Sequence, residues 1–332
     1  MSKAAEGTGT GIGGWSLGRL LAQQGILVAF VAAMLVFGLL SDRFLAFDNI
    51  MAVLRQIGIV GVMAIGVTMV VIGGNLDLSV GSMLSMATVL VVDLHDRIGP
   101  SAAILVMFGA VLTAGAVNGI LVGYLRLNSL IVTLGMLSTL QGITLIYTDG
   151  KNVDIADQSA TWFAIFGRGD VLGVPTSILM FFGIAALGHI LLTHLPFGRQ
   201  VYATGGNPRT AVYSGIRRGR VVFFTYLISS FTVGCSALIL GSRVMGSQNN
   251  VGQGYELLVL SAVILGGTSL LGGSGNMLKT VIGVLILGFI QNGLLLLGFP
   301  YYAQWLVTSV VIILTVWLDV ASKRGRLWSH IA

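Results

Sequence analysis

The sequence predicts an all-α membrane protein with about ten transmembrane helices. Hydrophobic residues make up 55% of the 332 residues and charged residues only 9%, whereas a soluble domain carries about 25% charged residues. The apolar residues form continuous runs of membrane-spanning length, without the alternating polarity of barrel strands. These observations exclude a soluble globular protein and favour helices over a β-barrel.

The predicted spans follow the apolar runs along the chain. In order they are Gln24 to Leu40, Ile50 to Ile72, Ser79 to Leu94, Ser101 to Tyr124, Leu130 to Tyr147, Thr176 to Leu195, Val221 to Leu240, Leu257 to Leu270, Thr280 to Leu297 and Ala303 to Val320. They form a single transmembrane domain over residues 24–320, with tails at residues 1–23 and 321–332. Cys235, the only cysteine, lies in one of these runs and is expected to be a buried apolar side chain.

The charges of the loops orient the spans. The loop from Pro196 to Arg220 is rich in arginine and has no acidic residue, and the C-terminal tail carries Lys323, Arg324 and Arg326. Positively charged loops stay in the cytoplasm, so both segments are expected there. The loop from Asp149 to Pro175 has no positive excess and is expected outside. This assignment places both termini in the cytoplasm.

A polar interruption separates the second and third predicted spans. Gly73 and Gly74 end a helix at low cost, and Asp77 and Ser79 suit the N-cap of the next helix. Such a break at membrane depth is tolerated only against protein or a watery cavity, so the segment is either an interfacial turn or part of a substrate path. The path candidates include two asparagines followed by glycine in later spans, and they are Asn75, Asp77, Ser79, Asn118 and Asn292.

The basic loop contains signals for a short helix. Asn207 suits the N-cap, Pro208 the first helical position and Gly215 the C-terminal cap. The pattern predicts a rigid basic helix that docks a cytosolic partner; the alternative is a solvated loop whose arginines only set topology or touch anionic lipid. The predicted docking segment comprises Gly205, Gly206, Asn207, Pro208, Arg209, Tyr213, Ser214 and Gly215.

The sequence offers no catalytic residues, metal site or cofactor site. No nucleophile is paired with a base, and Leu278 stands before Lys279 where a phosphate-binding loop requires glycine. Acids inside the spans are scarce, Asp77 being the clearest, which disfavours a proton- or sodium-coupled carrier. We therefore expect a protein that is not an enzyme and that takes its energy from another polypeptide.

Several motifs resemble the ribose-type ABC sugar permeases. Gly74 to Ser82 resembles the Gly-Gly-Ile-Asp-Leu-Ser-Val-Gly-Ser stretch of that family, and the resemblance extends from about Phe47 to Asp319. The chain departs from the pattern at Asn75, Leu76 and Ser129, where Gly, Ile and Pro are expected, so the sugar need not be ribose itself. The other matching stretches are Asn128 to Gly142, Thr148 to Gly150, Tyr202 to Ile216, Tyr255 to Gly275 and Asn292 to Gly298.

The resemblance implies one subunit of an ATP-driven importer in the bacterial inner membrane. Its fold would be similar to the large importer permeases with ten helices, including the vitamin B12 type. Two permease subunits, identical or paralogous, would form the path for a monosaccharide. A cytoplasmic ATPase using ATP and Mg would dock on Gly205 to Gly215, and a periplasmic binding protein would deliver the sugar to a surface that includes the loop from Asp149 to Pro175.

Other functions remain open on the sequence. An ABC permease for a nucleoside, polyol or branched-chain amino acid would show the same features. A stand-alone secondary carrier or channel would move solute in liposomes without ATP or partners. A structural membrane scaffold would show no transport with any partner.

Overall fold

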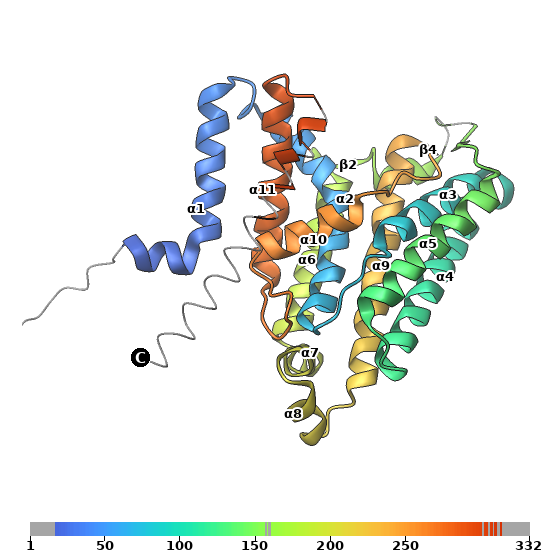
Figure 1. Cartoon of the computed structure of the whole chain (residues 1–332). Coiled ribbons are helices and arrows are strands. Elements are labelled where there is room, and N and C mark those ends of the chain that lie inside the picture. The colour runs from blue at the N-terminus through green and yellow to red at the C-terminus, as the bar shows by residue number, and fades with distance from the viewer. Residues whose placement is uncertain are drawn as a thin grey trace, which may run out of the picture.

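The computed structural model describes residues 17–156, 158, 161–300, 302–304, 306, 307, 309, 310 and 313 (Figure 1). The chain is mostly helical, as predicted, with four two-residue strands, a π-helical segment and a 3-10 helix. The elements are α1 (Leu17–Leu40), α2 (Phe47–Ile72), α3 (Val80–Ile98), α4 (Pro100–Gly119), η1 (Ile120–Tyr124), α5 (Ser129–Thr148), β1 (Val153–Asp154), η2 (Trp162–Phe166), β2 (Asp170–Val171), β3 (Val174–Pro175), α6 (Thr176–Thr193), α7 (Pro196–Gly206), α8 (Pro208–Tyr213), α9 (Arg218–Val244), β4 (Gly246–Ser247), α10 (Tyr255–Leu265) and α11 (Met277–Leu296).

Six helices in the described part of the chain are long and apolar enough to cross a membrane. They are α2, α4 continued by η1, α5, α6, α9 and α11, and each coincides with a predicted span. The total of about ten spans stays a prediction. Helix α1 begins at Leu17, so residues 17–23 of the predicted N-terminal tail are helical. The predicted span from Ala303 to Val320 lies largely outside the described residues.

The predicted span from Leu257 to Leu270 is wrong as a continuous helix. Helix α10 has 11 residues and ends at Leu265. At about 1.5 Å per residue it covers about half of a hydrocarbon core of roughly 30 Å. The helix ends because Gly266 and Gly267 follow, and Gly267 takes a φ of 78° that a side-chain-bearing residue rarely adopts.

The bundle has two distinct ends (Figure 1). We call the end with α7, α8 and the N-terminus of α9 the basic end, and the opposite end with β1 to β4 the strand end. At the strand end, β1 pairs antiparallel with β4 and β2 with β3. This pairing ties the predicted external loop to the segment after α9.

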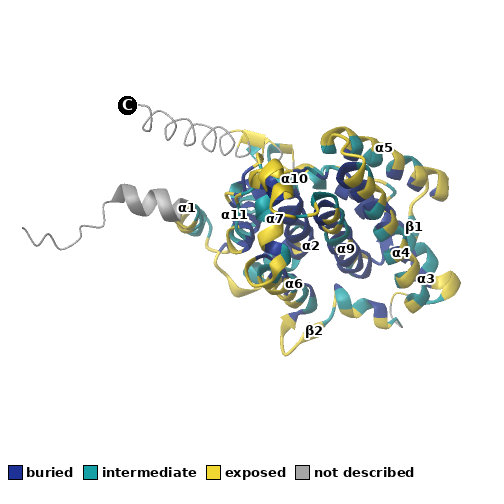
Figure 2. Cartoon of the chain, turned by 90° about the horizontal axis from the view of Figure 1, so that it is seen from below, coloured by how far each residue is buried: buried dark blue, intermediate teal, exposed yellow. Residues whose placement is uncertain are grey.

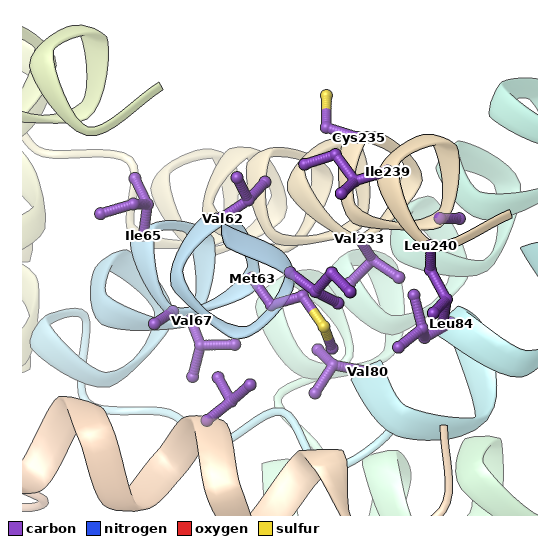
Figure 3. Close-up of a cluster of buried hydrophobic side chains, with 14 of the residues drawn as sticks. Val62, Met63, Ile65, Val67, Val80, Leu84, Val233, Cys235, Ile239 and Leu240 are labelled. Atoms are coloured by element: carbon purple, nitrogen blue, oxygen red, sulfur yellow. The ribbon is translucent and has the colours of Figure 1, made fainter. Parts of the chain in front are cut away.

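Helices α2 and α9 form the centre of the molecule. They pack more extensively against each other than any other two elements, and Figure 2 shows both surrounded by outer helices with exposed faces. Figure 3 shows their contact, where Val62 and Met63 of α2 lie beside Val233 and Ile239 of α9. Cys235 is buried, as predicted. Large apolar side chains on the outer helices are exposed, among them Leu105, Ile146 and Leu187, as expected for helices that face lipid.

Small residues bring α4 and η1 close to α9. Gly115, Gly119 and Gly123 recur every four residues on the face that meets α9. A Cβ added to Gly119 would lie 2.9 Å from the Cα of Phe223, and one added to Gly123 would lie 2.6 Å from the carbonyl oxygen of Gly219. Lipid provides no hydrophobic drive between helices, so such close backbone contact supplies much of the packing energy.

Candidate functional site

The polar break between α2 and α3 is real and is buried. Gly73 and Gly74 end α2, and Gly74 has a φ of 78°. The Asp77 carboxylate accepts from the backbone N–H of Ser79 at 3.1 Å and from the Ser79 hydroxyl at 2.6 Å. Its second oxygen accepts from the Ser229 hydroxyl of α9 at 3.0 Å. The break is therefore held to the centre of the bundle by its one acid.

The predicted cap at Ser79 is wrong in its chemistry. Ser79 directly precedes α3, but its side chain accepts no bond from the first amides of that helix. Its hydroxyl donates to Asp77, and its oxygen accepts from the side-chain amide of Asn118 rather than from the backbone of α3. Asp77 is not the N-cap either, because its carboxylate accepts from the backbone N–H of Ser79, which lies before the first residue of α3.

Two further contacts hold the backbone of the break. The Tyr226 hydroxyl of α9 donates to the carbonyl oxygen of Leu76 at 2.7 Å. The backbone N–H of Leu76 donates to the Ser129 hydroxyl of α5 at 3.2 Å. Leu76 and Ser129 are two of the positions where the chain departs from the sugar-permease pattern. The proline expected at residue 129 has no hydroxyl, so this contact depends on the departure at Ser129, whereas any residue except proline at position 76 would supply the backbone N–H.

The structure brings four of the five path candidates to this break. Asn118 of α4 donates to the Ser79 hydroxyl at 2.9 Å, and its own Oδ1 has no partner among the described residues. Asn75 donates to the carbonyl oxygen of Gly73 at 3.1 Å. None of the four is more than 7% exposed. A buried amide oxygen without a donor is a group that a hydrogen-bond donor from outside the described chain would satisfy.

The fifth candidate, Asn292, lies elsewhere. It exchanges hydrogen bonds with the Asn49 side chain of α2 at 2.9 and 3.0 Å. This reciprocal amide pair joins α11 to the first turn of α2. The pair uses the amide oxygen and nitrogen of Asn292, so the structure supplies a packing role for this residue.

Part of the predicted docking segment forms helix α8 at the basic end, whereas its first two residues, Gly205 and Gly206, end α7. The Asn207 side chain accepts from the backbone N–H of Thr210 at 3.1 Å, and Pro208 is the first helical residue. Gly215 has a φ of 83° and donates to Val212, while Ile216 donates back to Ala211. Both ends of the helix are therefore capped as predicted. Tyr213 is 90% exposed and available to a partner.

Three glycine pairs meet beside α8, and we call them the glycine junction: Gly73–Gly74, Gly205–Gly206 and Gly272–Gly273. A Cβ added to Gly205 would overlap the carbonyl oxygen of Ile72, and one added to Gly272 would lie 2.6 Å from the Cα of Gly74. The N–H of Gly273 donates to the same Ile72 carbonyl at 2.8 Å. The segment that leads into α8 thus touches the start of the polar break backbone to backbone.

A tyrosine reinforces this junction from α7. The Tyr202 hydroxyl donates to the carbonyl oxygen of Gly275 at 2.9 Å. Burial raises the pKa of the Tyr202 phenol, which keeps it a neutral donor. Helix α7, the glycine loop and the end of α2 therefore form one connected unit.

Sequence reasoning missed the groups that anchor the break. Tyr226 and Ser229 were not predicted as site residues, although two serines in succession at 229–230 interrupt an apolar run. Ser129 was identified only as a departure from the sugar-permease pattern. The repeated glycines of α4 could have indicated that α9 packs closely there. Among the described residues, no three His, Cys, Asp or Glu side chains gather in a way that could hold a metal ion.

Residues 49–316 match the family described as the branched-chain amino acid transport system permease component. The chain is 36% identical to the ribose import permease protein RbsC of Escherichia coli strain K12 over 305 residues, covering 90% of this chain and 94% of that relative. It is 37% identical to RbsC of Bacillus subtilis strain 168, covering 90% and 93%, respectively. It is also 32% identical to the L-arabinose transport system permease protein AraH of Escherichia coli strain K12, covering 98% of both chains.

No solved structure matches the chain. The family match and the relatives confirm the resemblance that the motifs of the break and the basic loop indicated. The match spans the break, helix α8 and the glycine junction together. The chain therefore belongs to the family of branched-chain amino acid transport system permease components.

Proposed function

We propose that this chain is the membrane permease of a binding-protein-dependent, ATP-driven importer for a monosaccharide. The observation that carries the proposal is similarity over at least 90% of both chains to permeases named for ribose and arabinose. In this proposal the chain itself is not an enzyme. A partner ATPase would hydrolyse ATP with Mg. Two permease subunits, identical or paralogous, would enclose the path in a bacterial inner membrane, with the basic end in the cytoplasm.

The proposed mechanism is alternating access. ATP-driven closure of the partner ATPase would move α8, which presents the exposed Tyr213 and Arg209. The glycine junction would pass this motion to the end of α2, because Gly205 and Ile72 are in direct backbone contact. The polar break begins at Gly73 and would open toward the sugar. A rigid link is required here, since a mobile loop would dissipate the displacement.

The polar break is proposed as the narrow part of the path. In the structure its four polar candidates are buried and bonded to one another or to the backbone. A sugar would exchange hydroxyl contacts with Asn118 and Ser79 as the break opens. The binding protein, rather than this site, would supply most of the selectivity.

The proposal is tested by co-purifying the chain with its ATPase and binding protein and screening sugars for stimulation of ATP hydrolysis. A pentose or hexose that stimulates hydrolysis only through the binding protein is the expected result. Transport by the isolated chain in liposomes without ATP would contradict the proposal and favour a stand-alone carrier.

A branched-chain amino acid is the second candidate substrate, because the matching family model bears that description. The same screen should therefore include leucine, isoleucine and valine. Stimulation by one of these and by no sugar would transfer the proposal to an amino acid importer.

The docking role of α8 has its own test. Replacing Asn207 and Pro208 with Ala removes the cap and the preset first residue of a six-residue helix. We expect normal membrane insertion but loss of coupling between ATP hydrolysis and uptake. Asn128→Ala is the matched control, because it removes a similar cap from α5, which has 20 residues. Full uptake by the Asn207 and Pro208 variant would contradict the docking role.

A further inference from the structure

Two hollows adjoin the N-terminus of α9 at the basic end. One has a volume of about 420 Å³ and lies between the start of α7 and the start of α9. The other has a volume of about 520 Å³ and lies between the end of η1, α8 and α9. They share Gly215, Ile216, Arg217 and Arg220, so they flank the same short segment of chain.

The larger hollow is lined by an unusual number of arginines. Arg126, Arg217, Arg218 and Arg220 all contribute to it. The four ion pairs found among the described residues involve other side chains, namely Arg55–Asp170, His95–Asp96, Arg97–Asp93 and Lys151–Asp149. Like charges that line one hollow repel one another. The arrangement therefore favours the binding of an anion from outside the described chain.

The position on α9 adds to this repulsion. The first turn of α9 contains no acidic residue, and no side chain caps its amides. The N-terminus of a helix carries partial positive charge, which makes it a poor place for Arg217, Arg218 and Arg220. A phosphate beside these groups would reduce both the repulsion among the arginines and their repulsion by the helix N-terminus.

Apolar side chains in and next to the hollow linings are exposed. Tyr124 lines the larger hollow and is 55% exposed, and Phe224 lines the smaller one and is 39% exposed. Leu125 and Leu127, on either side of Arg126 in the sequence, are 60% and 48% exposed. The Arg220 guanidinium lies 5.8 Å from the centroid of the Phe224 ring. Aromatic side chains beside arginines are typical of the level where lipid headgroups meet acyl chains. The surface therefore combines arginine side chains with exposed aromatic and leucine side chains next to them.

We infer that the hollows around Arg217 and Arg220 bind the headgroup of an anionic phospholipid. The phosphate lies against the guanidinium groups, which present planar, bidentate donors to it. The acyl chains lie along the exposed side chains of Tyr124 and Phe224. The inference rests on the proposed function only in placing the basic end at the cytoplasmic leaflet, which carries anionic lipid.

The test counts lipids bound to the purified permease alone. Wild-type protein and variants are exchanged into mixed phosphatidylcholine and phosphatidylglycerol, and retained lipids are counted by native mass spectrometry. We expect wild type to retain phosphatidylglycerol and Arg217→Gln with Arg220→Gln to bind it roughly 10- to 30-fold more weakly. Arg199→Gln with Lys279→Gln is the matched control, because it removes the same charge from residues outside both hollow linings.

Retention of the lipid by the control and its loss from the Arg217 and Arg220 variant would support the site. Equal loss from both double variants would overturn it, because net charge alone would then explain binding. Unchanged lipid binding with weaker ATPase affinity would also overturn it and make the hollow a protein contact. Arg126→Gln, on the opposite wall, provides an independent variant if the double variant does not fold. Absence of sugar-stimulated ATP hydrolysis would count against the proposed function and leave this lipid count unaffected.

Discussion

At the scale of single residues, the polar break is a closed hydrogen-bond network around Asp77. This side chain is 3% exposed and accepts from two hydroxyls and one backbone N–H. Ser229 and Tyr226 come from the central helix, so the network connects the break to the most buried helix pair. Buried polar groups of this kind stabilise one conformation only while all partners are present.

Asp77→Ala should therefore destabilise the protein more than Asp77→Asn. Alanine leaves the donors of Ser79 and Ser229 without an acceptor, and each unpaired buried group costs about 1–3 kcal/mol. Asparagine keeps one oxygen for Ser79, and its amide can donate to the Ser229 oxygen. Thermal unfolding in detergent measures the difference. Equal midpoints for wild type and Asp77→Ala would show that the network contributes nothing to stability.

At the scale of elements, α7, the glycine loop and the end of α2 form one connected unit through the glycine junction, next to α8. The sequence identified the short helix because caps are local signals, and the structure confirms Asn207 and Gly215 in those positions. It did not identify the contact between Gly205 and Ile72, since these residues are far apart in sequence. Glycine at this junction allows two backbone segments to approach closely, in addition to allowing the chain to turn.

Gly205→Ala should disrupt this unit. The added Cβ would overlap the Ile72 carbonyl oxygen, so the backbone of α7 must shift away from α2. We expect a lower unfolding midpoint and weaker stimulation of the partner ATPase by substrate. Gly142→Ala is the control, because no atom lies within 4 Å of the added Cβ and alanine favours a helix by roughly 0.5–1 kcal/mol. A Gly205→Ala protein with full coupling would rule out transmission through the junction.

At the scale of the whole molecule, the two ends of the bundle differ in charge and in secondary structure. Unpaired arginines surround α8 and the start of α9, whereas the four ion pairs among the described residues lie at the strand end. The strand end also presents Leu172, fully exposed between β2 and β3. This asymmetry fits a protein whose basic end faces the cytoplasm.

Labelling of single cysteines tests that orientation. Cys235 is buried, so wild-type protein should react poorly with a membrane-impermeant maleimide and serves as the control. Leu172→Cys should react from outside intact cells, and Tyr213→Cys should react only in inverted vesicles, because both positions are at least 90% exposed at opposite ends. Labelling of both from the same side would contradict the predicted topology.

The sequence by itself determined the membrane class, most span positions, the polar break and the capped basic helix. These features depend on apolar runs and local cap chemistry, which a linear pattern records. It failed at α10, where a glycine pair ends an apolar run early. It also did not show that Asn292 lies away from the break and pairs with Asn49.

Only the tertiary structure decided which distant groups meet. The contact of Ser129 with Leu76, the anchoring of Asp77 by Ser229, and the approach of Gly205 to Ile72 each join segments from different helices. Such contacts depend on helix packing angles and depths, which small residues permit but do not specify. The physical reason is that hydrogen bonding inside each helix is satisfied locally, whereas the partners of a broken segment come from whichever helices pack around it.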